Sequence, residues 1–339
     1  MLEEYSNVLV TGGAGFIGSH VVDSLLSLSK KVVVFDNLLS ALEENVPSGA
    51  TLVRGDVRNP RQIAEAAKGA DLIFHLAANA NGTVSVNDPR LDFETNALGT
   101  FNVLDAALQA GVRKFVHLSS ASVYGTPQRF PMGEDHPTKP FVPYGASKLA
   151  AEICCRSFFD TYGLPVVIGR PFCVYGPREN PQLALVEVAR YVRWHLNGKP
   201  IQIVGDPDRK TRDFVHVSDV VQGLLLTADR APVGEVLNLG SGEEVTMREL
   251  ADVIGSATGR TVVIDAIPEI TDDTYRLVGD VSKIRSLGYA PRVSLAEGVK
   301  DLAEKLGERP EMPTGPTIFK RGQRAEDLGR VHTRIHPTS

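Results

Sequence analysis

The segment from Val8 to Gly18, which reads V-L-V-T-G-G-A-G-F-I-G, constrains the fold of this chain more than any other part of the sequence. An apolar run ends at Thr11, three glycines follow at a spacing of three residues, and an apolar helical pattern comes next. In a strand–turn–helix unit, the first glycine permits the tight turn, the second lets a pyrophosphate approach the backbone, and the third lets the helix pack closely on the sheet. The helix N-terminus then offers unpaired N–H groups and a partial positive charge to the phosphates. The segment therefore predicts a dinucleotide-binding turn built on Gly12, Gly15 and Gly18.

An acidic residue at the end of the next apolar run favours a dinucleotide-binding turn over an ordinary tight turn. Asp36 ends the run V-V-V-F-D and lies 18 positions after Gly18. A carboxylate at that place accepts hydrogen bonds from the hydroxyls of an adenosine ribose and repels a 2′-phosphate. Because positions 37–42 hold no Arg or Lys that would attract such a phosphate, the sequence favours NAD over NADP as the cofactor.

The first two-thirds of the chain alternates short apolar runs with longer helical patterns. Apolar runs without alternation indicate strands that are buried on both faces, and helices between them imply parallel connections. We therefore predict an α/β fold with a Rossmann-type, doubly wound parallel sheet. The expected strands are Val8–Thr11, Val32–Asp36, Thr51–Gly55, Leu72–Leu76, Lys114–Ser119 and Val166–Arg170, and the expected helices are Phe16–Leu28, Pro60–Lys68, Pro89–Ala110 and Tyr144–Tyr162.

After Arg170 the pattern becomes less regular, which predicts a smaller C-terminal α/β substrate domain packed over the open edge of the sheet. We place the cofactor-binding Rossmann domain at residues 1–170, with some later segments returning to it, and the substrate domain at 171–308. Residues 309–339 contain four prolines and little apolar periodicity, so we expect a peripheral or flexible tail. The expected strands of the second part are Ile201–Val204, Asp213–Val217, Val236–Leu239 and Thr261–Ile267, and the expected helices are Leu183–Asn197, Ser218–Asp229, Thr246–Thr258 and Leu295–Gly307.

The charge and the cysteine content exclude several other classes of protein. The formal net charge is −5 and the basic residues are scattered, so we expect no nucleic-acid partner. No apolar run approaches the roughly 20 residues that cross a bilayer, and the N-terminus lacks a signal-peptide pattern, so we expect a cytoplasmic protein with no membrane partner. Cys154, Cys155 and Cys173 form no CxxC pair, so we expect reduced thiols and no metal site.

A tyrosine and a lysine four positions apart form the candidate catalytic pair. Tyr144 and Lys148 share one face at the start of an expected helix. A phenol with an unperturbed pKa of about 10 is a poor base at neutral pH, and a nearby cation lowers that pKa. A chance spacing of two exposed residues would give the same pattern. Ser120 supports the catalytic interpretation, because it follows the strand Lys114–Ser119, whose end opens into the ligand crevice of such a sheet.

Five short motifs along the chain carry a resemblance to a known family. They are T-G-G-A-G-F-I-G from Thr11, H-L-A-A from His75, L-S-S-A-S-V-Y-G from Leu118, Y-x-x-x-K from Tyr144, and R-D-F-V-H-V from Arg212. Together they resemble the extended short-chain dehydrogenase/reductase family and, more narrowly, its nucleotide-sugar epimerases, over residues 7–305. The resemblance implies a tightly held NAD, a sugar nucleotide in the cleft and transient oxidation of the sugar.

The resemblance also implies roles for individual residues, matched by position. Ser120, Tyr144 and Lys148 match the catalytic trio. Arg212 and Arg276 match arginines that clamp a diphosphate, although T-Y-R-L-V-G-D around Arg276 departs from the commoner R-P-x-D pattern. The implied cofactor contacts are Gly12, Gly15, Phe16, Ile17, Asp36, Asn37, Ser40, Asp56, Val57, Leu76, Ala77, Ala78, Asn96, Tyr144, Lys148 and Pro171. The implied substrate contacts are Ser85, Ser122, Cys173, Arg178, Gln202, Arg212 and Arg276.

The two residues after Ser120 discriminate between the reactions of the family. The resemblance implies an Asp-Glu pair directly after the active-site Thr in 4,6-dehydratases, and a Glu two places after it in uronate decarboxylases. This chain has Ala121 and Ser122 there, and neither shuttles a proton as a carboxylate does. We therefore expect an NAD-dependent UDP-sugar 4-epimerase, in which Tyr144 takes the proton of the C4 hydroxyl and a 4-keto sugar turns over in the cleft. A net reductase, a decarboxylase and a non-catalytic NAD-binding regulator are the alternatives.

The sugar and the assembly are less constrained by the sequence. UDP-glucose/galactose and UDP-glucuronate/galacturonate are both candidates, and Arg178 either pairs with a sugar carboxylate or has a structural or phosphate-side role. Nothing near Cys173 in the sequence would activate its thiol as a nucleophile. The family often pairs the helices 89–110 and 144–162 across a dimer, so we expect a homodimer, with ordinary sheet-covering faces as the alternative. His75, His117 and His216 lie in or at the ends of apolar strands, which favours core or crevice-wall positions over ligand roles.

Overall fold

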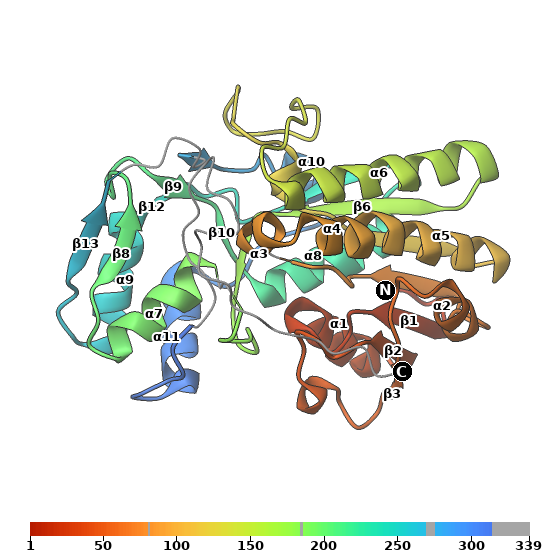
Figure 1. The fold of residues 1–339 in the computed structure, drawn as a ribbon, viewed down its shortest axis with the longest axis horizontal. Coiled ribbons are helices and arrows are strands. Elements are labelled where there is room, and N and C mark those ends of the chain that lie inside the picture. The colour runs from red at the N-terminus through yellow and green to blue at the C-terminus, as the bar shows by residue number, and fades with distance from the viewer. Residues whose placement is uncertain (81, 184–185, 269–274, 314–339) are drawn as a thin grey trace.

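The computed structural model describes residues 1–80, 82–183, 186–268 and 275–313. A seven-stranded sheet lies at its centre in the order β11-β6-β5-β4-β1-β2-β3, and every neighbouring pair is parallel (Figure 1). This architecture confirms the predicted Rossmann-type α/β fold. The strands are β1 (Asn7–Thr11), β2 (Lys31–Asp36), β3 (Thr51–Arg54), β4 (Leu72–His75), β5 (Lys114–Leu118), β6 (Val166–Pro171) and β11 (Val236–Leu239).

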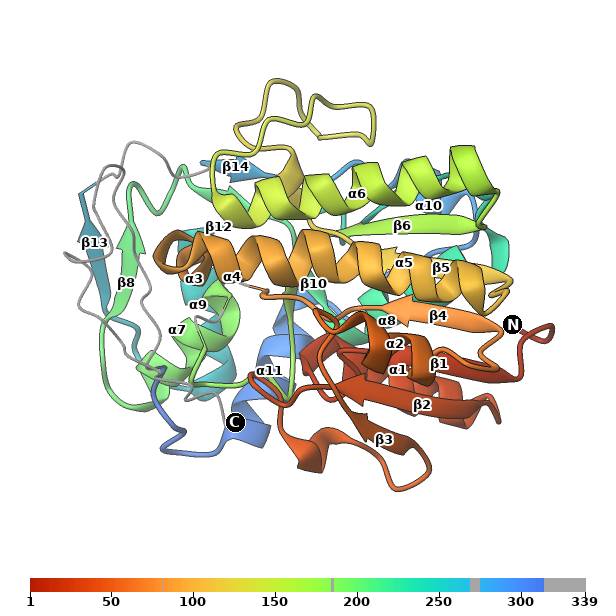
Figure 2. The same ribbon diagram turned by 45° about the vertical axis from the view of Figure 1, so that its right-hand side comes forward.

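Helices cover both faces of the sheet and form an apolar core with each. One face carries α1 (Phe16–Ser27) and α8 (Val217–Arg230), and the other carries α2 (Pro60–Ala66), α5 (Gly99–Gln109) and α6 (Pro143–Tyr162). All residues of β4 and β5 are buried, which explains why these runs are apolar without alternation. Figure 2 shows α5 and α6 running side by side along their face, where they contact each other.

The strand predicted at Val236–Leu239 joins the central sheet. It forms β11 and pairs in parallel with β6, although 64 residues separate Pro171 from Val236. The helix α8 before it and α10 (Ser282–Arg285) after it also pack on the central sheet. Local periodicity could not reveal this pairing, because it depends on a long-range connection. The boundary at residue 170 stays a prediction.

The single helix predicted at Pro89–Ala110 is interrupted. The structure has α4 (Pro89–Phe93), a π-helical turn η2 (Glu94–Leu98) and then α5. Short π-helical segments insert one extra residue per turn and occur often at functional sites. The turn places Asn96 so that its side chain both accepts from Asn79 N at 2.7 Å and donates to Asn79 O at 3.2 Å. An apolar-periodicity argument does not detect such an insertion.

A second group of elements forms its own apolar core beside the sheet, at the left in Figure 1. Two of its helices, α9 and α11, start with capping boxes, formed by Thr246–Glu249 and Ser294–Glu297. The predicted helix Leu183–Asn197 begins at Glu187, and residues 184–185 lie outside the described part. The helices are α7 (Glu187–Leu196), α9 (Met247–Thr258) and α11 (Leu295–Leu306), and the strands are β7 (Cys173–Tyr175), β8 (Ile201–Val204), β9 (Thr211–Arg212), β10 (Phe214–His216), β12 (Val245–Thr246), β13 (Ile264–Ile267) and β14 (Arg276–Leu277).

Only the start of the predicted C-terminal tail falls within the described residues. Arg193 Nη1 donates to Glu311 O and Asn197 Nδ2 donates to Pro310 O, each at 2.8 Å, so these residues are attached to α7. The prediction for residues 314–339 lies outside the described part of the chain. The remaining short elements are α3 (Gly82–Asn87), η1 (Glu43–Asn45) and η3 (Ala121–Val123).

Candidate active site

The glycine turn between β1 and α1 has the geometry that its sequence predicts. Gly12 has a φ of 71°, in the left-handed region, and a Cβ at this position would lie 2.6 Å from Ala77 N. A Cβ at Gly18 would collide with Gly12 O, so the first turn of α1 lies directly against the turn. The loop and the start of α1 thus form a cradle of exposed backbone that larger residues would fill. This cradle fits a pyrophosphate at a helix N-terminus.

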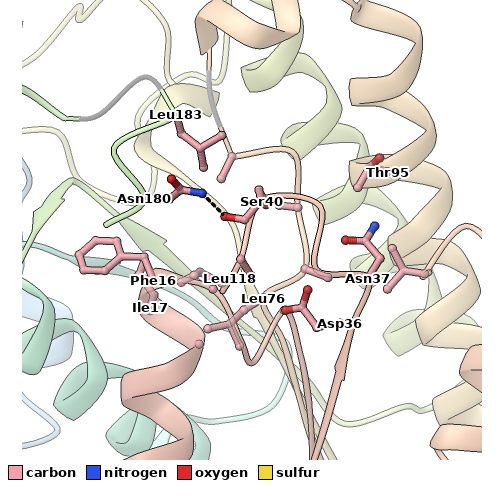
Figure 3. A pocket seen from close by; sticks show the side chains of 18 of the residues that line it. Phe16, Ile17, Asp36, Asn37, Ser40, Leu76, Thr95, Leu118, Asn180 and Leu183 are labelled. Carbon is pink, nitrogen blue, oxygen red and sulfur yellow. Dashed lines mark hydrogen bonds between the residues drawn. The ribbon is translucent and has the colours of Figure 1, made fainter. Parts of the chain in front are cut away.

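Asp36 lies at the end of β2, beside the glycine turn (Figure 3). Its side chain is buried, with Oδ2 accepting from Ala14 N at 3.1 Å and Oδ1 accepting from Leu38 N at 2.9 Å. Burial raises the pKa of Asp36, while these backbone donors lower it. Each carboxylate oxygen keeps a second lone pair, so the group can still accept from ribose hydroxyls.

One pocket joins the glycine turn to the Tyr–Lys pair. Two of the predicted cofactor contacts do not line it: Asn96 bonds to Asn79, and Asp56 bonds to Arg58 and Asn37. Several residues that line the pocket were not predicted, and they come from loops and from the short helical turns η1 and η2. The predicted residues that line it are Gly12, Gly15, Phe16, Ile17, Asp36, Asn37, Ser40, Val57, Leu76, Ala77, Ala78, Tyr144, Lys148 and Pro171. The residues that were not predicted include Ala41, Leu42, Asn45, Ala80, Thr95, Asn180 and Leu183 (Figure 3).

Tyr144 and Lys148 lie in the first turns of α6, which begins at Pro143. A proline suits the first helical position because its missing N–H would be unpaired there anyway. Tyr144 N donates to Ser85 Oγ at 3.0 Å, and Lys148 Nζ donates to Leu118 O at 2.7 Å. Lys148 is therefore attached to the end of β5, and the backbone of Tyr144 is attached to α3.

Burial shifts the pKa values of Tyr144 and Lys148 in opposite directions. Burial raises the pKa of Tyr144 to about 12, and a hydrogen bond with Ser120 lowers it only in part. Burial also lowers the pKa of Lys148 to about 8. In the protein alone the phenol is therefore protonated at neutral pH, and Lys148 is close to its titration range. A positive charge close to the phenol would lower its pKa.

The residues predicted to contact substrate fall into separate places. Ser122 is next to the pair, since its N–H donates to Ser120 Oγ at 3.1 Å. Arg178 lines the cofactor pocket and pairs with Asp23 at 2.7 Å, from a backbone with a φ of 73°. Burial raises the pKa of Cys173, which agrees with an unactivated thiol.

The two predicted phosphate-clamp arginines lie on adjacent strands of a three-stranded sheet. Arg212 on β9 is buried and lies 3.3 Å from Glu187. Arg276 on β14 pairs with Glu244 at 2.7 Å and stacks over the ring of Phe130 at 3.9 Å. Gln202 on β8 is exposed. The roles of these residues stay predictions.

The three histidines occupy core or wall positions. His75 bonds to Thr11 Oγ1 at 2.7 Å and to Thr100 Oγ1 at 2.9 Å, and burial lowers its pKa to about 3. Burial also lowers the pKa of His117, which stacks on His75. His216 caps α8. Within the described ranges, no group of three or more His, Cys, Asp or Glu side chains could hold a metal ion. No helix in that part of the chain is long and apolar enough to cross a membrane.

The glycine cradle, Asp36 and the Tyr144–Lys148 pair face one pocket, and this combination defines a class: enzymes that hold NAD on a Rossmann sheet beside a Tyr–Lys pair. Comparison with known proteins identifies the family within this class. The model of the NAD dependent epimerase/dehydratase family matches residues 8–240, and the chain belongs to that family. NAD is its cofactor, as the sequence predicted.

Individual relatives cover most of the chain. It is 38% identical over 304 residues to a UDP-glucose 4-epimerase of Mycolicibacterium smegmatis, covering 87% of this chain and 97% of the relative. Among solved structures, it resembles the UDP-glucose 4-epimerase of Thermus thermophilus in complex with NAD, with a TM-score of 0.82 and 36% identity. The match covers 88% of this chain and 98% of that chain. It also resembles the dTDP-glucose 4,6-dehydratase DesIV of Streptomyces venezuelae with bound NAD and TYD, with a TM-score of 0.81 and 33% identity. The match covers 88% of this chain and 96% of that chain. The chain is thus an enzyme of the epimerase/dehydratase family, and its reaction must be argued from its own residues.

Proposed function

We propose that this protein is an NAD-dependent 4-epimerase of a UDP-sugar. The observation that carries the proposal is the site around Ser120: the Tyr144–Lys148 pair lies beside it, and the next two residues are Ala121 and Ser122. A 4-epimerase needs one group that takes and returns the proton of the C4 hydroxyl, and no further acid–base pair. Bound NAD supplies a positive charge and a reversible hydride acceptor.

The residues of the pair have distinct tasks in this proposal. Tyr144 removes the proton of the C4 hydroxyl, and Ser120 holds the C4 oxygen by a hydrogen bond. Lys148 donates to Leu118 O, which holds its ammonium group at the end of β5. The 4-keto sugar then turns over in the cleft, and Tyr144 returns the proton when the alcohol forms again.

A dehydratase or decarboxylase would need a carboxylate free to act as acid or base next to this pair. Ala121 is buried and Ser122 bonds to Ser120, so neither position supplies one. The carboxylate of Glu152, one turn after Lys148, is held by Arg170 at 2.6 Å and by the hydroxyl of Ser119. These contacts support epimerisation over the two alternatives.

The contacts of Arg178 bear on the identity of the sugar. Its guanidinium pairs with Asp23 on α1, which supports a structural role for this side chain. We therefore place UDP-glucose and UDP-galactose before UDP-glucuronate as the proposed substrates. Arg212, which is buried and near Glu187, is the residue that we propose for the diphosphate.

Product analysis tests the proposal directly. The purified protein is incubated, without added NAD, with UDP-glucose, UDP-galactose, UDP-N-acetylglucosamine or UDP-glucuronate, and the sugars are identified by NMR. We expect interconversion of UDP-glucose and UDP-galactose. A 4-keto-6-deoxy product would assign a dehydratase, pentose formation from UDP-glucuronate would assign a decarboxylase, and a requirement for added reduced cofactor would assign a net reductase.

We also propose that two copies associate through the helices at 89–110 and 144–162. Large apolar side chains are exposed there, with exposures of 55% for Phe93, 45% for Phe101 and 63% for Ile153. These residues belong to α4, α5 and α6, which lie on one face of the sheet. An apolar surface of this kind on neighbouring helices is typical of a protein–protein interface.

A further inference from the structure

Asp92 is a buried carboxylate on α4, a helix that packs against α6. Its relative exposure is 0%. Burying a carboxylate away from water is strongly destabilising unless donors and opposite charge compensate for it. The donors and charged groups around Asp92 therefore indicate its role in the site.

Both oxygens of Asp92 accept hydrogen bonds. Ser147 Oγ donates to Oδ2 at 2.5 Å, and Asn96 Nδ2 donates to Oδ1 at 3.1 Å. Two donors directed at the two oxygens suit an ionised carboxylate, which only accepts. Burial raises the pKa of Asp92, while the hydrogen bond from Ser147 and the charge of Lys148 lower it. Ser147 immediately precedes Lys148 in α6, so one of these bonds fixes the helix turn that carries the catalytic pair.

The second bond extends to the wall of the cofactor pocket. Asn96 lies in the π-helical turn η2 and is bonded at 2.7 Å to Asn79 N. Asn79 follows Ala77 and Ala78, which line the pocket, and Thr95 in the same turn lines it too. Asp92 thus joins α6, η2 and the loop after β4 through one buried carboxylate.

Asp92 also determines the charge around Lys148. Burial lowers the pKa of Lys148, and the negative charge of Asp92 is the first of the effects that raise it. Glu152, which also raises it, is paired with Arg170 at 2.6 Å, and burial raises the pKa of Cys155, so that its thiol stays neutral. Asp92 therefore favours the ammonium form of Lys148.

The other titratable groups near Lys148 do not replace that charge. His75 and His117 are neutral at working pH, since burial and the charge of Lys148 both lower their pKa. Tyr144 is itself affected by Asp92, whose negative charge raises the pKa of the phenol. Asp92 thus raises the pKa of Lys148 and also that of Tyr144. A titration that follows the Lys148 side chain alone measures the first of these effects.

We propose that Asp92 is a positioning residue of the active site, which keeps the Lys148 side chain charged and fixes the first turns of α6 against the π-helical turn. The inference rests on the proposed roles of Tyr144 and Lys148. It assigns to Asp92 no contact with substrate or cofactor. It explains why a carboxylate occupies a fully buried position on α4.

The variant Asp92→Asn tests the proposal, because it keeps the size and one acceptor but removes the charge. Lysine side-chain nitrogens of the isotope-labelled, NAD-loaded protein are followed by NMR as pH is raised, and the Lys148 signal is assigned by its loss in Lys148→Arg. Because the charge of Asp92 raises the pKa of Lys148, we expect the titration midpoint of Lys148 in Asp92→Asn to lie about one pH unit below that of the parent. Glu94→Gln, which removes an exposed carboxylate paired with Arg90 close to Asp92 in sequence, leaves the midpoint unchanged.

Turnover provides the second measurement. Because the ammonium is lost as pH rises, the alkaline limb of the pH profile moves to lower pH in Asp92→Asn and stays in place in Glu94→Gln. An unchanged Lys148 midpoint in Asp92→Asn, or an equal shift in Glu94→Gln, would overturn the inference. The NMR titration needs no substrate, so a failure of the proposed epimerase reaction leaves this test intact and is distinguished from it. If Asp92→Asn does not fold, Ser147→Ala removes one hydrogen bond of the same carboxylate. Full activity in Ser147→Ala would then contradict the positioning role.

Discussion

Asn180 Nδ2 donates a hydrogen bond of 3.0 Å to Ser40 O, and this contact connects the segment after β7 to the loop after β2 (Figure 3). Both residues line the cofactor pocket, and 140 positions separate them in the sequence. The neighbouring Arg178 pairs with Asp23 at 2.7 Å, and Pro177 O bonds to His20 at 3.1 Å. Three contacts thus attach the segment from Pro177 to Asn180 to the cofactor domain.

The variant Asn180→Ala should release NAD faster. One hydrogen bond across the pocket contributes about 1 kcal/mol, so we expect the release rate to rise about fivefold. Loss of bound NAD is measured after dilution into a large excess of a competing cofactor analogue. Gln109→Ala, which removes an amide bonded to Asp105 on the surface of α5, is the matched control. Equal release rates in the parent and in Asn180→Ala would show that the contact does not retain the cofactor.

Replacing Gly18 with Ala should damage the cofactor cradle. The new Cβ would collide with Gly12 O, which is backbone and cannot rotate away. Overpacking of this kind costs about 1–3 kcal/mol, so NAD affinity should fall by about 5- to 150-fold. NAD content after purification and the gain in Tm on adding NAD are the measurements. Gly49→Ala is the control, because its Cβ would meet only the methyl groups of Leu26 at 3.3 Å. A Gly18→Ala protein that binds NAD like the parent would contradict the cradle.

Replacing Tyr144 with Phe should stop turnover and leave the cofactor bound. The phenol is the proposed base, and loss of a general base lowers kcat by about 100-fold or more. The ring still fills its place at the start of α6, since the backbone N–H of Tyr144, not its hydroxyl, bonds to Ser85. Interconversion of UDP-glucose and UDP-galactose is measured beside the NAD content. Tyr162→Phe, at the exposed end of α6, is the control, and comparable kcat values in the two variants would rule out the proposed role.

The parts of the site that were predicted from the sequence are local in the chain. The glycine turn and Asp36 belong to one strand–helix–strand unit, and Tyr144 and Lys148 to one helix, so spacing and residue type were sufficient. Apolar runs indicated parallel, buried strands, and β4 and β5 are indeed fully buried. The conclusion about NAD needed no knowledge of distant contacts.

The parts that were missed depend on distant segments. Asn180 meets Ser40 only because β7 and β2 end on the same side of the molecule, and β11 pairs with β6 across a long connection. The role of Asp92 depends on an insertion of one residue in a helical turn, which leaves no periodic signal. Such features follow from tertiary packing, which competes with local preference and outweighs it.

Replacing Glu152 with Gln should destabilise the protein. Its carboxylate pairs with Arg170 at 2.6 Å, and both side chains are only 6% exposed. Removing one partner leaves a buried guanidinium without its counter-charge, which costs about 3 kcal/mol or more. The free energy of unfolding is measured in denaturant at saturating NAD, because bound cofactor itself adds stability. Asp160→Asn, from the exposed Arg156–Asp160 pair on the same helix, should cost less than about 1 kcal/mol. Similar losses of unfolding free energy in both variants would show that the buried pair stabilises the protein no more than the exposed pair does.

Replacing Ile153 with Glu should convert the proposed dimer into monomers. Ile153 is 63% exposed on α6, and Phe101 on the neighbouring α5 is 45% exposed, so the two contribute to one apolar face. A charge placed there would be buried without a partner when two copies associate, which is strongly unfavourable. Sedimentation velocity over a range of protein concentrations measures the change. Val263→Glu, at a side chain that is 60% exposed in the second group of elements, alters charge equally and should leave the dimer intact. A parent protein that sediments as a monomer, or an Ile153→Glu protein that sediments like the parent dimer, would refute association through this face.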